Sequence, residues 1–333
     1  MNILLTGGTG YIGSHTALAL LSEGHQVFLY DNLVNSKREV VSQIEVISGV
    51  KAPFIEGDVR DTQKLTEVMR SNKVDRVIHF AGLKAVGESS ANPLLYFSNN
   101  VSGIISLLNA MNSSNIHQLV FSSSCTVYGN AQSCPISEDH ALNASSPYGQ
   151  SKLISELMLK DLCNSNPLWR VACLRYFNPV GAHQSGLIGE DPNGIPNNLM
   201  PYITRVAAGR SSRLNIFGND YPTDDGTGVR DYIHVMDLAE GHLAALSYLD
   251  HTAGFEAFNL GTGKGVSVLD VVSCFEESTL QKVPYQVVAR RSGDVAKAFA
   301  KVDKAKKLLG WGAKLGLREM CISSWEWQKN SMR

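Results

Sequence analysis

The chain has 333 residues, and since domains average ~150 residues we expect one large domain or two modest ones. Its 30 basic side chains nearly balance its 31 acidic ones, which argues against a partner as acidic as nucleic acid. Hydrophobic residues make up 44%, which is enough for a sizeable core and excludes a disordered chain.

The N-terminus carries no basic segment, and glycines interrupt its apolar run, so we expect no signal peptide. No run of the sequence is long and apolar enough to predict a membrane span. The six cysteines show neither CxxC nor CxxxH spacing. This favours reduced thiols, a cytoplasmic location and the absence of a metal site.

Short apolar runs alternate with longer amphipathic ones in the first half of the chain. The amphipathic runs predict helices near Tyr11–Glu23, Asp61–Ser71, Leu94–Met111 and Ser151–Cys163. The apolar runs predict strands at Asn2–Thr6, Gln26–Asp31, Pro53–Glu56, Arg76–Phe80, Gln118–Ser123 and Arg170–Tyr176. Strands that are apolar on both faces and separated by helices indicate a Rossmann-type, doubly wound parallel sheet in an α/β fold.

The pattern changes after Phe177. Residues 178–198 contain four glycines and three prolines without a sustained period, which predicts a long functional loop. Helix starts are expected at Asp237 and Ser267, which precede Glu240 and Asp270 by three residues. Short strands are predicted at Leu214–Phe217, Val229–His234 and Phe255–Asn259. We expect a nucleotide-binding domain over residues 1–177 and a smaller mixed α/β domain over 178–333, with an approximate boundary and segments that can interleave.

The first predicted strand runs into a glycine-rich turn with glycines at positions 7, 10 and 13. Such a turn brings the backbone close to a pyrophosphate, which the N-terminus of the next helix attracts. Alone it is weak evidence, and a purely structural turn is the alternative. Asp31 ends the second strand 18 residues after Gly13, where a carboxylate binds ribose hydroxyls and repels a 2′-phosphate, so NAD is favoured over NADP. Asp58 suits an adenine amino group or is an exposed loop acid.

Tyr148 and Lys152 are four residues apart, a spacing that places both on one face of a helix. Ser124 follows a predicted strand at the carboxyl edge of the sheet, where doubly wound folds bind their ligands. An ammonium ~5 Å from a phenol favours the phenolate by roughly 3 kcal/mol at an effective dielectric constant of ~20. We therefore predict that Tyr148 is the base for a hydroxyl proton, that Lys152 lowers its pKa and holds the nicotinamide ribose, and that Ser124 bonds the reacting oxygen.

Together these features resemble the extended short-chain dehydrogenase/reductase family. Longer segments narrow the resemblance, over nearly the whole chain, to the UDP-glucose 4-epimerases. They are Asp31-Asn32-Leu33, Asn35-Ser36-Lys37-Arg38, HFAGLKAVGES (79–89), SPYGQSK (146–152), LRYFNPVGAH (174–183), GIPNNLMPY (194–202), IFGNDYPTDDGTGVRDYIHVMDLA (216–239) and RRSGDV (290–295).

The resemblance implies a site for NAD and one for a UDP-sugar. The implied NAD contacts are Gly7, Gly10, Tyr11, Ile12, Gly13, Asp31, Asn32, Asn35, Ser36, Asp58, Val59, Phe80, Ala81, Gly82, Lys84, Asn99, Ser122, Tyr148, Lys152 and Phe177. The implied UDP-sugar contacts are Ser124, Tyr148, Asn178, Asn198, Leu199, Phe217, Arg230, Tyr232, Arg291, Asp294 and Ala298.

The resemblance also implies a mechanism, a substrate range and an assembly. Transient oxidation at carbon 4 with retained NAD gives a 4-keto sugar, which turns over before hydride returns to its other face. Relatives restricted to unmodified hexoses commonly have tyrosine where this chain has Ala298, so the N-acetylated pair UDP-GlcNAc and UDP-GalNAc is expected to be accepted too, unless neighbouring side chains close the gap. A homodimer would use the helices near 94–111 and 151–163, whose apolar stripes can instead belong to the intrachain core.

Several other functions remain alternatives. One is an epimerase specific for the N-acetylated pair, and another is a sugar-nucleotide-binding protein without catalysis. Sugar-nucleotide 4,6-dehydratases share the tyrosine–lysine pair but need an Asp-Glu pair where this chain has Cys125 and Thr126. A net reductase would release NADH in each turnover. We expect neither nucleic acid nor a membrane as a partner.

Overall fold

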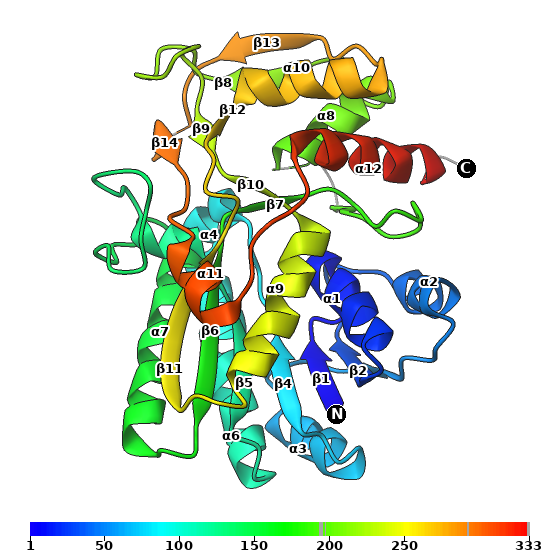
Figure 1. Ribbon diagram of the computed structural model, residues 1–333, viewed down its shortest axis with the longest axis vertical. Coiled ribbons are helices and arrows are strands. Elements are labelled where there is room, and N and C mark those ends of the chain that lie inside the picture. Colours follow the sequence, from blue (N-terminus) through cyan, green and yellow to red (C-terminus); the bar gives the residue numbers. More distant parts are fainter. Residues whose placement is uncertain (193–195, 197, 292, 332–333) are drawn as a thin grey trace.

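The computed structural model describes residues 1–192, 196, 198–291 and 293–331. A large sheet flanked by helices forms one part of the molecule, and a smaller group of helices and short strands lies at one end of it (Figure 1). We call this smaller group, whose helices are Leu199–Ala207, Val268–Thr279 and Leu317–Asn330, the C-terminal lobe.

The large sheet has seven strands, all parallel to their neighbours. Its order is β11 (Gly254–Leu260), β6 (Arg170–Tyr176), β5 (Gln118–Ser124), β4 (Arg76–His79), β1 (Asn2–Thr6), β2 (Gln26–Asp31) and β3 (Phe54–Glu56). The six strands predicted in the first half are all present, and the Rossmann-type fold is confirmed. Chain order reverses between β1 and β4, the point where such folds bind ligands at the carboxyl ends of the strands.

Helices cover both faces of this sheet. One face carries α1 (Tyr11–Ser22), α2 (Glu39–Ser48), α9 (Val235–Tyr248) and α11 (Asp303–Leu309). The other carries α3 (Thr62–Ser71), α6 (Ser102–Ser113) and α7 (Pro147–Ser165). Since successive side chains of a strand point to opposite faces, Ile3 and Leu5 join the first core and Leu4 joins the second.

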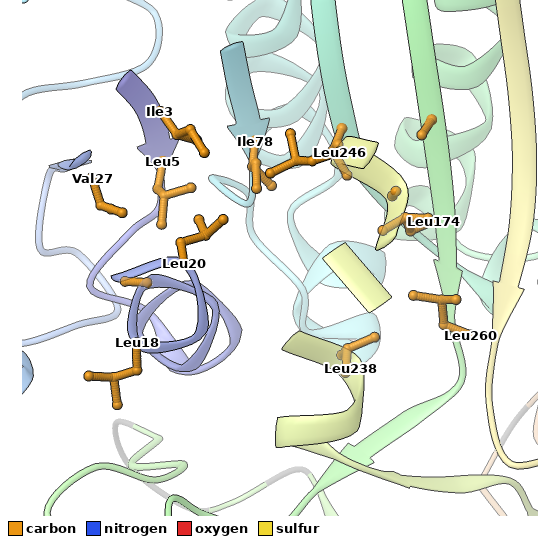
Figure 2. Packing of buried hydrophobic residues seen from close by; sticks show 14 of the residues in the cluster. Ile3, Leu5, Leu18, Leu20, Val27, Ile78, Leu174, Leu238, Leu246 and Leu260 are labelled. Carbon is orange, nitrogen blue, oxygen red and sulfur yellow. The ribbon is translucent and has the colours of Figure 1, made fainter. Parts of the chain in front are cut away.

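Figure 2 shows the first of these cores, in which Leu20 of α1 points toward Ile3 and Leu5 of β1, and to which Leu238 and Leu246 of α9 also belong. Burying one leucine side chain fully stabilises a fold by roughly 1.5–3 kcal/mol. Helix α9 and strand β11 both follow residue 177, so the second half of the chain returns to complete the sheet layer.

The helix predicted over 94–111 is interrupted. The chain forms α5 (Pro93–Tyr96), a π-helical turn (Phe97–Val101) and then α6. The π turn holds Asn99 and Asn100, and Asn100 is buried with its amide bonded to Leu83 and Ser151. These partners explain the extra residue in the turn, a feature frequent at functional sites. Helices α2 and α4 (Val86–Ala91) were not predicted.

The C-terminal lobe has its own hydrophobic core, built on α8 (Leu199–Ala207), α10 (Val268–Thr279) and α12 (Leu317–Asn330). Three small sheets accompany them: β13 (Tyr285–Val288) with β8 (Leu214–Phe217), β10 (Tyr232–His234) with β7 (Asn178–Val180), and β9 (Val229–Arg230) between β12 (Val266–Ser267) and β14 (Lys297–Ala298). The predicted strand over 229–234 is therefore divided at Asp231 between two sheets.

One predicted helix start is confirmed and one is wrong. Ser267 caps α10 and forms a reciprocal capping box with Asp270. Helix α9 instead begins at Val235, and the ring of His234 accepts the hydrogen bond from the backbone of Met236. The Asp237 carboxylate is used elsewhere, because it accepts the backbone N–H groups of Lys314 and Leu315.

In the described ranges, no helix is both long and apolar enough to cross a membrane.

Candidate active site

The glycine-rich turn after β1 is packed too closely for a larger residue at Gly7 or Gly13. Gly7 has a φ of 73°, and a Cβ atom there would lie 2.6 Å from the backbone nitrogen of Ala81. A Cβ atom on Gly13 would lie 2.3 Å from the carbonyl oxygen of Gly7. The turn therefore joins β1, α1 and the end of β4 at backbone contact, and leaves the N-terminus of α1 open to a phosphate.

A cavity of about 100 Å³ opens beside this turn, and we call it the cofactor cavity. It brings together eleven of the predicted NAD residues: Gly7, Gly10, Asp31, Asn32, Asn35, Ser36, Val59, Phe80, Ala81, Gly82 and Asn99. The lining also includes Tyr30, Val34, Gly57 and Leu83, which sequence reasoning missed although each lies within two residues of a predicted contact. A glycine cradle that a Cβ would fill, beside a cavity with a strand-end carboxylate, fits a dinucleotide.

Asp31 organises the rim of the cofactor cavity. One carboxylate oxygen accepts the backbone N–H of Leu33 at 2.9 Å and the hydroxyl of Ser36 at 3.0 Å, and the other accepts the backbone N–H of Thr9 at 3.2 Å. Asp31 thus ties the turn after β1 to the loop after β2, in addition to facing the cavity.

The carboxylate of Asp58 forms an ion pair with Arg60 at the protein surface. Both of its oxygens contact Arg60, at 2.6–2.8 Å, and Asn32 donates to it at 3.4 Å. The hydrogen bonds from Arg60 lower the pKa of Asp58 to about 2. A ligand amino group would therefore share this carboxylate with Arg60.

The predicted catalytic residues meet at the carboxyl end of β5. Ser124 is the last residue of β5, and Tyr148 lies in the first turn of α7, directly after Pro147. The hydroxyl of Ser146 caps this helix by accepting the N–H of Gly149 at 3.1 Å. The hydroxyl of Ser124 is close enough to that of Tyr148 to lower the pKa of the phenol, so a hydroxyl bound beside them would meet both groups.

Lys152 lies one helical turn beyond Tyr148 and is buried. Its ammonium donates to the carbonyl oxygen of Ser122 at 2.7 Å and lies 5.0 Å from the ring centre of Phe121. Gly82 leaves it room, since a Cβ there would be 3.6 Å from Nζ. Lys152 thus reaches the wall of the cofactor cavity. Burial lowers its pKa from 10.5 to about 8, and the negative charge of Glu156 partly opposes this shift.

That Lys152, together with a positive nicotinamide ring, lowers the pKa of Tyr148 stays a prediction for the site with its cofactor. In this structure burial raises the pKa of the phenol to about 12, and the neighbouring hydroxyl of Ser124 partly opposes this rise. The simple Coulomb argument left out the cost of burying a phenolate. At neutral pH Tyr148 is therefore a phenol in this structure, and a further positive charge beside it is needed to favour its ionised form.

A buried ion pair between Glu156 and Arg175 holds α7, the helix that carries Tyr148 and Lys152, against the sheet. Glu156, one turn after Lys152, accepts three hydrogen bonds from the guanidinium of Arg175 and one from the hydroxyl of Ser123. Arg175 also donates to the hydroxyl of Tyr128. These contacts connect α7 to β5 and β6, and therefore fix Tyr148 relative to Ser124.

The predicted UDP-sugar contacts gather in small groups in the C-terminal lobe. Asn178 and Tyr232 are paired between β7 and β10. The guanidinium of Arg230 contacts the carboxylate of Asp294 at 2.5 Å. The guanidinium carbon of Arg291 lies 3.9 Å from the ring centre of Phe217.

The last three predicted contacts lie on other elements. Asn198 precedes α8, and Leu199 is the first residue of this helix. Ala298 pairs with Arg230 between β14 and β9, and packs in a cluster with Phe177 and Cys125, the residue after Ser124.

Some observations lie outside the predicted site. A larger cavity of about 640 Å³ between α9 and the loop before α12 contains none of the predicted residues. Residues 194, 195, 197 and 292 of the quoted motifs lie outside the described residues. Within the described part of the chain, no group of three or more His, Cys, Asp or Glu side chains is arranged to hold a metal ion.

Sequence reasoning also missed two buried polar residues that shape the site. Asn100 links the loop after β4 to α7 through Leu83 and Ser151. Asp231 accepts hydrogen bonds from the backbones of Thr262, Gly263 and Ala300, and so holds the β9–β10 junction against two later segments. Polar residues inside apolar runs were the only signal in the sequence.

Comparisons with known proteins agree over the whole chain. The family model described as GDP-mannose 4,6 dehydratase matches residues 4–323. A UDP-glucose 4-epimerase from Bacillus subtilis is 54% identical over 332 residues, which cover 100% of this chain and 98% of that protein.

Two solved structures have the same fold. One is a UDP-glucose 4-epimerase from Stenotrophomonas maltophila with bound NAD and formylated UDP-arabinopyranose, at 49% identity and a TM-score of 0.98, covering 100% of this chain and 99% of that one. The other, from Bifidobacterium longum in complex with NAD+ and UDP, has 46% identity, a TM-score of 0.96 and the same coverage. The chain therefore belongs to the UDP-glucose 4-epimerase family, within the larger group that the dehydratase family model describes.

Proposed function

We propose that this protein is an NAD-dependent isomerase that interconverts UDP-glucose and UDP-galactose. The observation that carries the proposal is the meeting of Ser124, Tyr148 and Lys152 beside the cofactor cavity, in a chain 54% identical over its full length to a UDP-glucose 4-epimerase. Relatives solved with NAD and UDP share its fold throughout, which supports the same ligands here.

Each catalytic residue has one task in this proposal. The residues of the cofactor cavity would hold NAD, which would supply a hydride acceptor and a positively charged ring beside the phenol. Tyr148 takes the proton of the sugar's 4-hydroxyl and later gives it back, while Ser124, which lies beside the phenol, forms a hydrogen bond with the reacting oxygen. Lys152 places a positive charge at the cavity wall. The 4-keto sugar turns over between the two transfers, so both faces of carbon 4 are reached.

The C-terminal lobe anchors the UDP part of the substrate in this proposal. Arg230 and Arg291 suit its pyrophosphate, because a planar guanidinium forms two charge-assisted hydrogen bonds at once. Each is already held in place, Arg230 by Asp294 and Arg291 by the ring of Phe217. An anchor at the UDP end leaves the sugar free to rotate.

The substrate range is proposed to include the N-acetylated pair. Ala298 is half-buried on β14, opposite Arg230 and in the cluster that contains Cys125 and Phe177. A methyl side chain at this position leaves space that a tyrosine would fill. Coupled assays with both sugar pairs test this: we expect turnover of UDP-GlcNAc that Ala298→Tyr removes selectively, and no N-acetyl turnover by the wild type contradicts it.

A homodimer is proposed through α5, α6 and α7. Leu94 is 81% exposed, and Leu95, Ile105, Ile154 and Leu157 are exposed as well, so these helices present apolar side chains that the intrachain core does not cover. Exposed apolar side chains on helices that contact one another, as α5 and α7 do, favour an interface. Light scattering at micromolar concentration is expected to give twice the chain mass, and a monomer would contradict the proposal. We also propose a cytoplasmic location.

Dehydration is disfavoured by the residues after Ser124, although the matching family model carries a dehydratase's description. Burial raises the pKa of the Cys125 thiol to about 12, so this group is no acid or base near neutral pH. Thr126 donates its hydroxyl to Ser124 at 3.0 Å. Neither side chain supplies the carboxylates that elimination of water requires.

The proposal is tested by product analysis of the purified protein with UDP-galactose and no added NAD. We expect an equilibrium mixture of UDP-glucose and UDP-galactose without accumulation of NADH. NADH released in proportion to product would indicate a reductase. UDP-sugar binding without turnover would indicate a non-catalytic binding protein, and turnover of N-acetylated sugars alone would indicate the narrower epimerase.

A further inference from the structure

The segment 189–192 lies between the cofactor cavity and the C-terminal lobe and is held by its backbone. The carbonyl oxygen of Glu190 accepts the indole N–H of Trp327 at 3.3 Å, and that of Pro192 accepts Arg205 at 2.9 Å. A Cβ atom on Gly189 would lie 2.4 Å from the ring of Trp327. These contacts fix the position of Glu190 against α8 and α12.

The side chain of Glu190 is only 8% exposed, and one of its oxygens serves two donors. Oε1 accepts the ammonium of Lys84 at 2.8 Å and the amide of Asn198 at 2.6 Å. A carboxylate oxygen has lone pairs for both bonds, and the bond to the ammonium is charge-assisted.

The two donors belong to different parts of the molecule. Lys84 follows β4, two residues after Gly82 in the wall of the cofactor cavity. Asn198 precedes α8 in the C-terminal lobe, at a position where asparagine commonly caps a helix, yet its side chain makes no capping bond. Its amide is directed to Glu190 instead.

We propose that Glu190 is a positioning residue that couples the binding of NAD to the binding of the UDP-sugar. The inference rests on the proposed function and on the predicted contacts of Lys84 with NAD and of Asn198 with the UDP-sugar. A ligand that orders one donor also orders the other through the shared oxygen, so the second ligand loses less conformational freedom when it binds. Such coupling is reciprocal between the two ligands.

The test measures how fast NAD leaves the purified NAD-loaded protein, with and without saturating UDP. Rapid filtration followed by chromatography of the released nucleotide gives the rate and needs no turnover. We expect UDP to slow the release from the wild type by roughly fivefold or more, the lower end of typical coupling. Glu190→Gln keeps the size of the side chain but removes its charge. We expect UDP to slow NAD release from this variant by less than about twofold.

Two further variants separate coupling from folding. Asp191→Asn removes the neighbouring charge, which pairs with Lys37 at the surface, and is expected to keep the wild-type factor. Lys84→Met removes the ion pair with Glu190 by changing a side chain that is 60% exposed. We expect UDP no longer to slow NAD release from this variant, and the test remains available even if Glu190→Gln fails to fold.

The outcomes distinguish this inference from the proposed function. A wild type that binds neither NAD nor UDP overturns both. A wild type that binds both ligands without coupling, or variants at Glu190 and Lys84 that keep the wild-type factor, overturn the coupling role alone.

Discussion

The cofactor side and the substrate side of this site are built in different ways. On the cofactor side, Gly7 and Asp31 lie at or just after the carboxyl ends of strands in one continuous parallel sheet, and the catalytic Ser124 ends another strand of the same sheet. On the substrate side, Arg230, Phe217 and Asn178 lie on three separate sheets of two or three short strands.

This difference assigns a task to each side. A seven-stranded sheet with a core on both faces resists small displacements, as hydride and proton transfer require. The substrate side depends on individual ion pairs and stacked rings such as Arg230–Asp294 and Arg291–Phe217. Changes on the cofactor side are therefore expected to reduce the rate of chemistry or cofactor retention, and changes on the substrate side to reduce affinity.

The largest effect is expected for Tyr148→Phe. Removing the hydroxyl removes the proton acceptor, so kcat should fall by about 10³-fold, within the usual range for general acid–base groups. Calorimetry with UDP-galactose should show unchanged binding. Tyr96→Phe is the control, because this ring lies 6.5 Å from that of Tyr148 and its hydroxyl donates to Glu88 instead. Normal turnover by Tyr148→Phe contradicts the mechanism.

Lys152→Met is expected to lower kcat by about 10²-fold while stabilising the fold at pH 7. Burial lowers the pKa of this lysine to about 8, so the unfolded chain binds more protons than the folded one between pH 8 and 10.5. Wild-type stability relative to the variant should thus rise through this window. At pH 7 the buried charge costs up to about 3 kcal/mol, a difference that should vanish near pH 10.5.

Urea unfolding of wild type and Lys152→Met at pH 7 and pH 10 checks whether the difference in their free energies of unfolding shrinks as the pH rises. If the two proteins differ in free energy of unfolding by the same amount at both pH values, Lys152 does not titrate between them.

Gly13→Ala sharpens the comparison on the cofactor side. Its Cβ would meet the carbonyl oxygen of Gly7 at 2.3 Å, so the turn must shift, at a cost of roughly 1–3 kcal/mol in the free energy of unfolding. The purified variant should also contain less NAD, measured by absorbance after acid release. Gly87→Ala is the matched control, since nothing lies within 4 Å of its added Cβ. Equal NAD content in both variants would argue against a close approach of the dinucleotide to this turn.

The smallest effect is expected for Arg230→Lys. The charge remains, but the planar fork that contacts Asp294 and would grip a pyrophosphate is lost. We expect KM for UDP-galactose to rise about tenfold, or about 1.4 kcal/mol, with kcat nearly unchanged. A fall in kcat at constant KM would place Arg230 on the chemical side of the site and remove the distinction between the two regions.

Much of the cofactor side was predictable because its signals are local. The turn at Gly7 to Gly13, the strand-end Asp31 and the four-residue spacing from Tyr148 to Lys152 all depend on residues close in sequence. The interrupted helix over 94–111 was not predictable in this way, because its π turn depends on contacts of Asn100 with Leu83 and Ser151.

The amino-acid sequence by itself determined the parallel sheet, the glycine turn and which side chains carry the chemistry, since strand and helix periods and turn residues act over a few positions. Only the tertiary structure decided that β11 completes the sheet, that Asp237 binds a distant backbone rather than capping α9, and that Glu190 joins Lys84 to Asn198. It also decided the pKa of Tyr148, because burial raises this pKa and only the tertiary structure buries the phenol. Such effects depend on which distant segments exclude water from a group, and no local pattern encodes that.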